Sequence, residues 1–360
     1  MKRDSNIELL RIVAMFLIVV HHYCVNSGLI DLFDFNNITG NTILVQLLSF
    51  GGKVGVTIFF IISGFFMINS KFKLEKVVKL IFQILFYSWL IMAILMLCGY
   101  RYSIIEILAD LNAGLVSHST KSFFTSYLLV NILSPVINKM LTTISKKEFK
   151  FLLGVLLFYF CILSTFFFND TWNYFGWAFT CYCVGAYIRK HTNTTQHNTT
   201  QHNTTQHNII SFFICLILTY SGILILDFTQ FLPWTFMISN ANKLLLFMMA
   251  VNLFMIFKNI RIKYNKIINT AAASCLGVLL IHASSNTMRQ WLWKDFLCNV
   301  CWFESSWMWI HLLVSCITIY IVCTLIDMAR IQWLEKPLFK TKFVQTSIEK
   351  INKILLKYYR

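Results

Sequence analysis

Eight ionisable side chains lie within long apolar runs of the sequence, where a charge is costly and is therefore a candidate for function. They are Arg11, His21, His22, Lys53, Lys243, His282, His311 and Asp327. A guanidinium suits the binding of a phosphate or carboxylate, and an imidazole suits proton transfer near neutral pH. Each of the eight is therefore a candidate site residue.

Arg11 and His22 have the most informative spacing among them. Eleven residues return a helix to nearly the same face, three turns and roughly 16 Å further along. Both side chains can therefore line one interior channel, with Arg11 as a phosphate ligand and His22 as a general base. From the residues alone a second interpretation stays open, in which Arg11 reaches the lipid headgroups and His22 caps the other end of the helix.

A short motif in the second apolar segment reads Phe59-Phe60-Ile61-Ile62-Ser63-Gly64. Serine and glycine permit a close approach between helices, so packing is the simplest explanation. The alternative is that the motif lines a channel for a substrate.

Two further features accompany this motif. The run Gly51-Gly52-Lys53-Val54-Gly55 can break or kink its helix, and it places the ammonium group of Lys53 at membrane depth. His282 lies near the outer end of the ninth apolar segment, at a predicted depth close to that of His22.

The elements that must position these residues are membrane-spanning helices. Of the 360 residues, 57% are hydrophobic and 13% are charged, whereas a soluble domain carries roughly a quarter charged residues. Segments with the length that a spanning helix needs lie at 7–24, 44–68, 77–98, 122–143, 150–168, 172–188, 209–227, 239–257, 267–283 and 306–328. The sequence therefore predicts an all-α integral membrane protein with about ten transmembrane helices.

Lysine and arginine are concentrated in alternate loops between these segments. Because cytoplasmic loops are rich in these residues, we expect both ends of the chain to lie in the cytoplasm. The net charge of +16 resides in these short clusters, which favours contact with anionic membrane lipids and argues against nucleic acid as a partner.

We expect residues 1–330 to form one transmembrane domain and 331–360 a basic cytoplasmic tail, either an amphipathic helix on the inner leaflet or a solvated segment. Residues 191–208 are predicted to form a low-complexity loop, a flexible spacer built on Asn-Thr-Thr-Gln-His repeats. The repeat histidines recur every five residues without Cys or carboxylate, so no metal site is predicted. The Cys298–Cys301 spacing is only weak evidence for a disulfide or a metal.

The segment Ser5-Asn6-Ile7-Glu8-Leu9-Leu10-Arg11, running on to His21-His22-Tyr23, resembles the start of the membrane-bound acyltransferase-3 family. That family's arginine, ten residues, histidine motif falls on Arg11 and His22, and its Phe-Phe-x-x-Ser-Gly motif falls on Phe59, Phe60, Ser63 and Gly64. The likeness continues through Gly51–Val56, Leu133–Asn138 and Gly277–His282. The chain departs from the pattern at Ser122-Phe123-Phe124, where relatives often carry Tyr-Trp or Trp-Trp.

The resemblance implies an O-acyltransferase in the bacterial cytoplasmic membrane. Such an enzyme moves an acyl group, usually acetyl, from cytoplasmic acyl-CoA to a sugar hydroxyl of a surface polysaccharide such as capsule, exopolysaccharide or O-antigen, or of a lipid-linked glycan. Acyl-CoA is then a donor substrate, with no bound cofactor and no metal. Arg11 would hold the donor and His22 would be the general base or a transient acyl carrier.

Phe59, Phe60, Ser63, Gly64 and Lys53 would line the donor channel or bind substrate, and His282 would assist on the acceptor side. The alternative function is a transporter or flippase of lipid-linked glycan, for which interrupted helices in matching halves of the chain would be typical.

Overall fold

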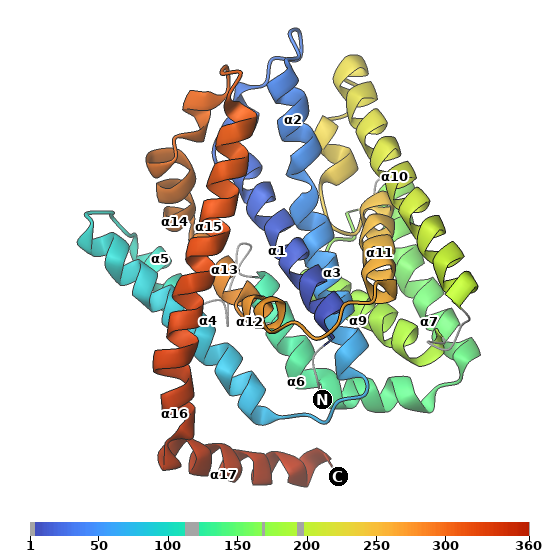
Figure 1. Ribbon diagram of the computed structural model, residues 1–360, viewed down its shortest axis with the longest axis vertical. Coiled ribbons are helices and arrows are strands. Elements are labelled where there is room, and N and C mark those ends of the chain that lie inside the picture. The colour runs from blue at the N-terminus through green and yellow to red at the C-terminus, as the bar shows by residue number, and fades with distance from the viewer. Residues whose placement is uncertain (1–3, 112–121, 168–169, 193–197, 360) are drawn as a thin grey trace.

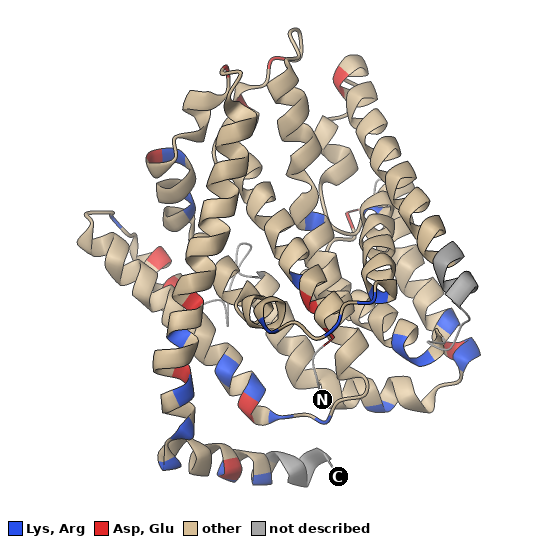
Figure 2. Ribbon diagram, viewed as in Figure 1, with Lys and Arg blue, Asp and Glu red and all other residues tan. Residues whose placement is uncertain are grey.

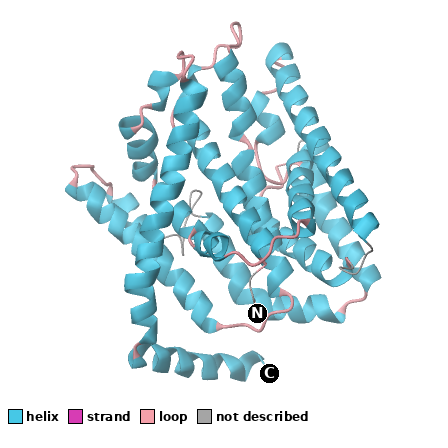
Figure 3. Cartoon of the chain, viewed as in Figure 1, coloured by secondary structure: helices cyan, strands magenta, loops and turns pink. Residues whose placement is uncertain are grey.

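The computed structural model describes residues 4–111, 122–167, 170–192 and 198–359. Within these ranges every regular element is a helix, as Figure 3 shows. Each of the ten predicted segments overlaps a helix or a pair of consecutive helices, so the prediction of an all-α protein is confirmed.

The helices follow one another with short connections (Figure 1). Their bounds are α1 Ser5–Val25, α2 Gly40–Ser49, α3 Gly51–Met67, α4 Leu74–Leu97, α5 Ile104–Leu111, α6 Ser122–Thr143, α7 Lys146–Leu157, α8 Leu163–Phe166, α9 Tyr174–His191, α10 Asn198–Thr229, α11 Leu244–Asn259, α12 Lys266–Ala273, α13 Cys275–His282, α14 Asn286–Gln290, α15 Met308–Arg330, α16 Lys336–Lys340 and α17 Lys342–Tyr359. Short 3₁₀ helices lie at Leu29–Leu32, Trp234–Ile238 and Asn299–Trp302, and π-helical turns at Phe158–Ile162, Trp291–Phe296 and Ile331–Glu335.

Six helices of the described part of the chain are long and apolar enough to cross a membrane, and a seventh span results if one bent pair is counted. They are α1, α2 with α3, α4, α7 with α8, α10 from Thr204, and α15 with α16. Exposed side chains on α10 and α15 are largely apolar, among them Phe213, Ile217, Val322 and Leu325. Such surfaces suit contact with lipid, and the chain is a multi-pass membrane protein; the count of ten spans and the orientation stay predictions.

The charged residues divide the bundle into two unequal ends. Figure 2 shows that lysine and arginine gather mainly at the end of the bundle where α1 begins and α17 lies, and are sparse at the opposite end. Both termini lie at the lysine-rich end (Figure 1). This arrangement agrees with the pattern that cytoplasmic loops show.

Glycines allow α3 to lie directly against α1 on one side and α9 on the other. A Cβ on Gly52 would lie 2.6 Å from the His21 ring, and one on Gly55 would meet the Ala14 carbonyl and the Ile18 side chain. Gly64 and Gly185 would meet the carbonyl oxygens of the facing helix in the same way. Without side chains at these positions the backbones can approach closely, which holds α1, α3 and α9 in fixed register.

The predicted break at Gly51–Gly55 is confirmed, because α2 and α3 meet at Phe50 rather than forming one straight helix. A break leaves carbonyl groups without helical partners. Nδ1 of His21 donates to the carbonyl oxygen of Ser49. His21 thus satisfies a carbonyl that the interrupted helix leaves free, which is a structural role.

A second interruption lies near the other end of the chain. The segment Lys266–His282 is followed by Asn286–Trp302 at an angle of 93°. α13 can approach α15 because Gly277 has no side chain where Asp327 lies. Asp327 is fully buried and accepts from Tyr87 at 2.9 Å and from Arg330 at 2.8 Å. This ionic cluster anchors the α13 helix that ends in His282.

Two predictions about local structure are wrong. Residues 198–208 are not a loop but the first turns of α10, which pack along α11; Asn259 Nδ2 donates to Thr205 Oγ1 at 3.0 Å. The long apolar segment that follows extends its helix back into the repeats, because each added residue completes another backbone hydrogen bond. His197 lies outside the described residues. Cys298 and Cys301, given little weight in the sequence, form a disulfide.

The predicted tail is helical. α15 continues through a π-helical turn into α16 as far as Lys340, and α17 then leaves at Thr341 in a different direction (Figure 1). The predicted boundary at residue 330 therefore falls inside a continuous rod. Phe343 and Ile354 of α17 are exposed, so an apolar strip on this helix has no protein partner among the described residues.

Candidate functional site

The structure brings His22 and His282 together although they are 260 residues apart. His22 lies in the last turn of α1 and His282 ends α13. Nδ1 of His22 lies 2.9 Å from Nε2 of His282. His282 is fully buried, and its Nδ1 lies 2.6 Å from the carbonyl oxygen of Val278.

These contacts fix the proton positions for two neutral rings. The Val278 carbonyl can only accept, so Nδ1 of His282 carries the proton it donates. Nε2 of His282 is then an acceptor, and Nδ1 of His22 must donate to it. Nε2 of His22 is left with a free lone pair. The geometry therefore makes His22, and not His282, the residue that can take a proton or attack a carbonyl.

Aromatic side chains surround the histidine pair. The Trp293 ring packs edge-on to His282 with centroids 6.2 Å apart. On the other side, the hydroxyl of Tyr23 and Nδ1 of His311 are 2.8 Å apart. Asn299 donates to the Tyr23 carbonyl at 3.2 Å, which ties the disulfide-bonded segment to the end of α1. These contacts hold His22 and His282 in place. His311 bonds Tyr23 and does not contact the two histidines through a hydrogen bond of its own.

Two basic side chains, Lys53 and Arg289, lie within electrostatic reach of His22. Lys53 comes from the first turn of α3, directly after the break at Phe50. Arg289 comes from α14, beyond the 93° bend. The break and the bend thus each deliver one positive charge to the histidine pair.

A basic cavity of about 520 Å³ opens at the Arg11 end of α1. It is bounded by α1, α3, α4, α6, α12, α13 and the segment that follows α15. Its polar and charged lining residues are Arg11, Ser63, Ser70, Lys71, Lys73, Lys76, Lys79, Gln83, Tyr127, Asn131, Ser134, Arg330 and Glu335. The site combines many cations with hydrogen-bonding groups, as a site for a phosphorylated ligand requires.

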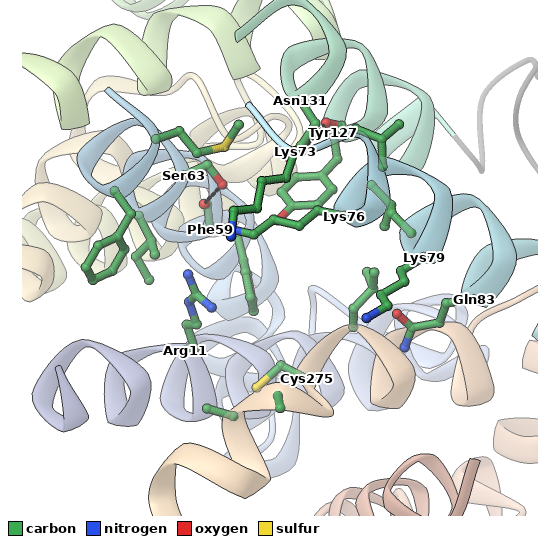
Figure 4. A pocket seen from close by; sticks show the side chains of 18 of the residues that line it. Arg11, Phe59, Ser63, Lys73, Lys76, Lys79, Gln83, Tyr127, Asn131 and Cys275 are labelled. Carbon is green, nitrogen blue, oxygen red and sulfur yellow. Dashed lines mark hydrogen bonds between the residues drawn. The ribbon is translucent and has the colours of Figure 1, made fainter. Parts of the chain in front are cut away.

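Arg11 is only weakly neutralised in this cavity. Its Nη1 is 3.6 Å from Glu8, its guanidinium lies over Phe66 at 5.8 Å, and its side chain is 29% exposed. Figure 4 shows Lys73 and Lys76 pointing toward Arg11 from across the cavity. Lys79 pairs with Glu75 at 2.7 Å. Arg11, Lys73 and Lys76 are therefore the cations best placed to share an anionic ligand.

The Phe-Phe-x-x-Ser-Gly motif divides between two roles. Phe59 and Ser63 line the cavity, and Ser63 donates to the Phe59 carbonyl at 2.9 Å. Phe60 is fully buried against Phe123, and Gly64 faces the α9 backbone. Phe59 and Ser63 thus form part of the cavity wall, whereas Phe60 and Gly64 pack that wall against the neighbouring helices.

Arg11 and His22 are connected along one face of α1. Met15 also lines the cavity, one turn beyond Arg11 in the direction of His22. The remaining seven residues span about 10 Å through buried side chains such as Ile18 and Val19. One helix therefore joins the basic cavity to the histidine pair.

The sequence did not single out Lys73, Lys76 or Arg289 as site residues. Lys73 and Lys76 belong to a basic cluster and Arg289 to a loop poor in charge, and both patterns indicate only the orientation of the chain in the membrane. The signal that could have found the lysines is their position just after the segment that carries the Phe59–Gly64 motif. Arg289 follows His282 by seven residues, and only the bend between them brings its side chain back.

Among the residues that the structure describes, no three His, Cys, Asp or Glu side chains group as metal ligands do. No curated protein and no solved structure matches the chain. A family model described as an acyltransferase domain matches residues 4–328, which contain both the basic cavity and the histidine pair. The protein is therefore a member of the membrane acyltransferase-3 family.

Proposed function

We propose that the protein is an O-acyltransferase of the bacterial cytoplasmic membrane. It takes an acyl group, acetyl in the simplest case, from cytoplasmic acyl-CoA and transfers it to a hydroxyl of a surface polysaccharide or its lipid-linked precursor. The main support for this proposal is that one helix joins the basic cavity at Arg11 to His22. Nε2 of His22 has a free lone pair.

The lining of the cavity supports acyl-CoA as the donor. Coenzyme A carries a diphosphate and a further phosphate, and Arg11, Lys73 and Lys76 supply cations for them. The pantetheine arm would follow α1 past Met15 and Phe59 toward His22. No cofactor needs to stay bound, because acyl-CoA arrives as a substrate and leaves as the free thiol.

Two chemical routes use the same lone pair. In the first, Nε2 of His22 removes the proton of the acceptor hydroxyl, the oxygen attacks the thioester carbonyl, and the C–S bond breaks. In the second, Nε2 attacks the thioester itself and passes the acyl group on to the hydroxyl. In both routes His282 holds the His22 tautomer, and Lys53 is near enough to favour the oxyanion that forms.

The first test is the O-acetyl content of the host's surface glycan, measured by proton NMR before and after mild base. Strains with the intact gene, a deletion, His22→Ala and His191→Ala are compared at matched membrane abundance. We expect one base-labile acetyl signal to be absent in the deletion and in His22→Ala, since general-base catalysis contributes about 10²–10⁴-fold. The His191→Ala strain, changed at the opposite end of the bundle, should keep it.

A flippase of lipid-linked glycan is the second candidate, and the interrupted α2–α3 and α13–α14 segments are what favours it. The same strains separate the two. An unchanged acetyl pattern with an altered amount or chain length of glycan would support the flippase. Loss of acetyl in the deletion but not in His22→Ala would keep the pathway and remove His22 from the chemistry.

A further inference from the structure

Arg289 occupies an unusual place beside the histidine pair. Its backbone N–H donates to the Ser285 carbonyl in the first turn after the bend. Its side chain turns back, and Nη2 donates to the carbonyl oxygen of Ala283 at 3.3 Å. Ala283 directly follows His282, so the guanidinium lies against the end of the helix that carries the His22 partner.

This guanidinium has little to satisfy it. An arginine side chain offers five N–H donors, yet Nε of Arg289 is buried without a protein partner, and no carboxylate lies within ion-pair distance of it in the described part of the chain. Arg330, by contrast, is buried with Asp327 at 2.8 Å and Glu335 at 2.7 Å. A guanidinium without a carboxylate partner retains donors for an anionic ligand.

Other donors near Arg289 are unsatisfied as well. Ser284 Oγ and Trp293 Nε1 are buried without protein partners, and the Trp293 ring packs on His282. Three polar groups within ten residues therefore surround the same helix end, and buried polar groups are normally paired. Of these groups, the side chain of Arg289 is the one that is partly exposed and can be reached by a ligand.

The charge around the histidine pair is one-sided. Arg289 and Lys53 both act electrostatically on His21 and His22, and among the described residues no carboxylate does so. Arg289 also interacts with Tyr174, whose ring packs on Trp172 with centroids 4.8 Å apart. Partly exposed aromatic rings beside a cation form a surface suited to a sugar that carries a negative group.

We propose that Arg289 binds an anionic group of the acceptor, so that the hydroxyl presented to His22 belongs to an acidic glycan. The anion is a carboxylate or phosphate on the sugar, or the phosphate that joins the sugar to its lipid carrier. This inference rests on the proposed acyl transfer, and it assigns Arg289 to acceptor binding rather than to the chemical step.

The test uses the full chain in lipid nanodiscs with acetyl-CoA and two matched pairs of acceptors. The first pair is methyl glucoside and methyl glucuronide, which differ by a carboxylate on the sugar. The second is citronellyl glucoside and citronellyl phosphoryl glucose, which differ by a phosphate at the lipid linkage. We expect the anionic member of one pair to be preferred about tenfold or more in kcat/KM, as a charge-assisted contact supplies.

Arg289→Gln should abolish this preference, so that the ratio of kcat/KM for the anionic acceptor to kcat/KM for its neutral partner falls to about one. Arg289→Lys should keep part of it, because a point charge remains. Lys294→Gln is the matched control, since Lys294 is an exposed cation five residues further on and should keep the full preference. Equal use of neutral and anionic acceptors, or a preference that survives in Arg289→Gln, would overturn the proposal.

A binding measurement separates this inference from the proposed function. The anionic probes should raise the Tm of the unmodified chain, but not that of Arg289→Gln. If no acceptor is acetylated and this Arg289-dependent shift persists, the anion site stands and the transferase assignment fails. If transfer proceeds without charge preference, the transferase stands and the anion site fails. With neither transfer nor shift, both fail.

Discussion

The two ends of α1 place Arg11 and His22 in opposite surroundings. Arg11 opens onto a cavity of about 520 Å³ lined by lysines, and its partly exposed side chain forms one loose ion pair, with Glu8 at 3.6 Å. His22 instead meets His282, which is fully buried and held by the Val278 carbonyl. One end is ready for a charged molecule from water, and at the other a partly exposed histidine is held by a fully buried one.

This difference assigns separate tasks to the two residues. Binding a phosphorylated donor needs access and several cations, whereas activating a hydroxyl needs a fixed ring and the exclusion of water. Water near a thioester would compete with the intended acceptor. Keeping the two tasks about 16 Å apart on a rigid helix lets a single chain satisfy both requirements.

The largest effect is expected when the His22 end of α1 is disturbed by a substitution at His282. His282→Ala removes the acceptor for Nδ1–H of His22 and leaves the ring free to rotate and change tautomer. We expect kcat to fall about 10²-fold with the KM for acyl-CoA unchanged. Steady-state transfer kinetics in nanodiscs would check this, together with the pH–rate profile, which a purely structural defect would not shift.

The outcome that contradicts this role is a loss of kcat and donor binding in equal measure. That pattern would mean that His282 supports the whole bundle. Because His311 bonds Tyr23 and not His22, His311→Ala is a comparison within the same region, and it should lower kcat less than His282→Ala does.

The open end can be tested through its lysines. Replacing Lys73 and Lys76 together by glutamine should raise the KM for acyl-CoA about tenfold and leave kcat nearly unchanged, because the loss affects donor binding alone. The effect should shrink at high salt, since exposed charges are screened. Lys147→Gln with Lys150→Gln is the matched control.

Those two control lysines are exposed at the start of α7 and do not line the cavity. If the control pair raised the KM as much as Lys73 and Lys76 do, general positive charge at the membrane surface would explain donor capture. The cavity would then lose its special role.

The smallest effect is expected from a substitution in the close contact between α3 and α9. Gly64→Ala places a methyl group against the Tyr182 carbonyl of α9, and we expect it to lower the free energy of unfolding by about 1–3 kcal/mol. Gly154→Ala, in α7 with open space around it, should be neutral or add about 0.5–1 kcal/mol. Thermal unfolding in one detergent compares the two, and equal effects would show that the α3–α9 contact is loose.

Much of the fold could be predicted from local pattern. Long apolar runs and their basic flanks predicted the helices, and the glycines around Lys53 predicted the break at Phe50. The repeats at 198–208 were misjudged because their composition is polar, whereas a neighbouring apolar helix and contacts with α11 decide their conformation. α5 was missed for a related reason, since eight residues are too few to stand out in a loop.

The candidate site was only half predictable. The Arg11–His22 spacing follows from helix geometry alone, and the depth of His282 hinted at its position. The hydrogen bond between His22 and His282 depends on how two helices 260 residues apart pack, which no local pattern encodes. The charges of Lys73, Lys76 and Arg289 could equally help to orient the chain in the membrane. Their sequence context therefore did not separate that role from ligand binding.

The helical state of the repeats changes what a variation in their number would do. A loop absorbs an extra five-residue unit as slack. In α10 each added unit would lengthen a rod by about 7.5 Å and turn its starting point by about 140°. Copies gained or lost at this end would therefore move and rotate the first residue of α10. The contacts of α10 with α11 further along would keep their register.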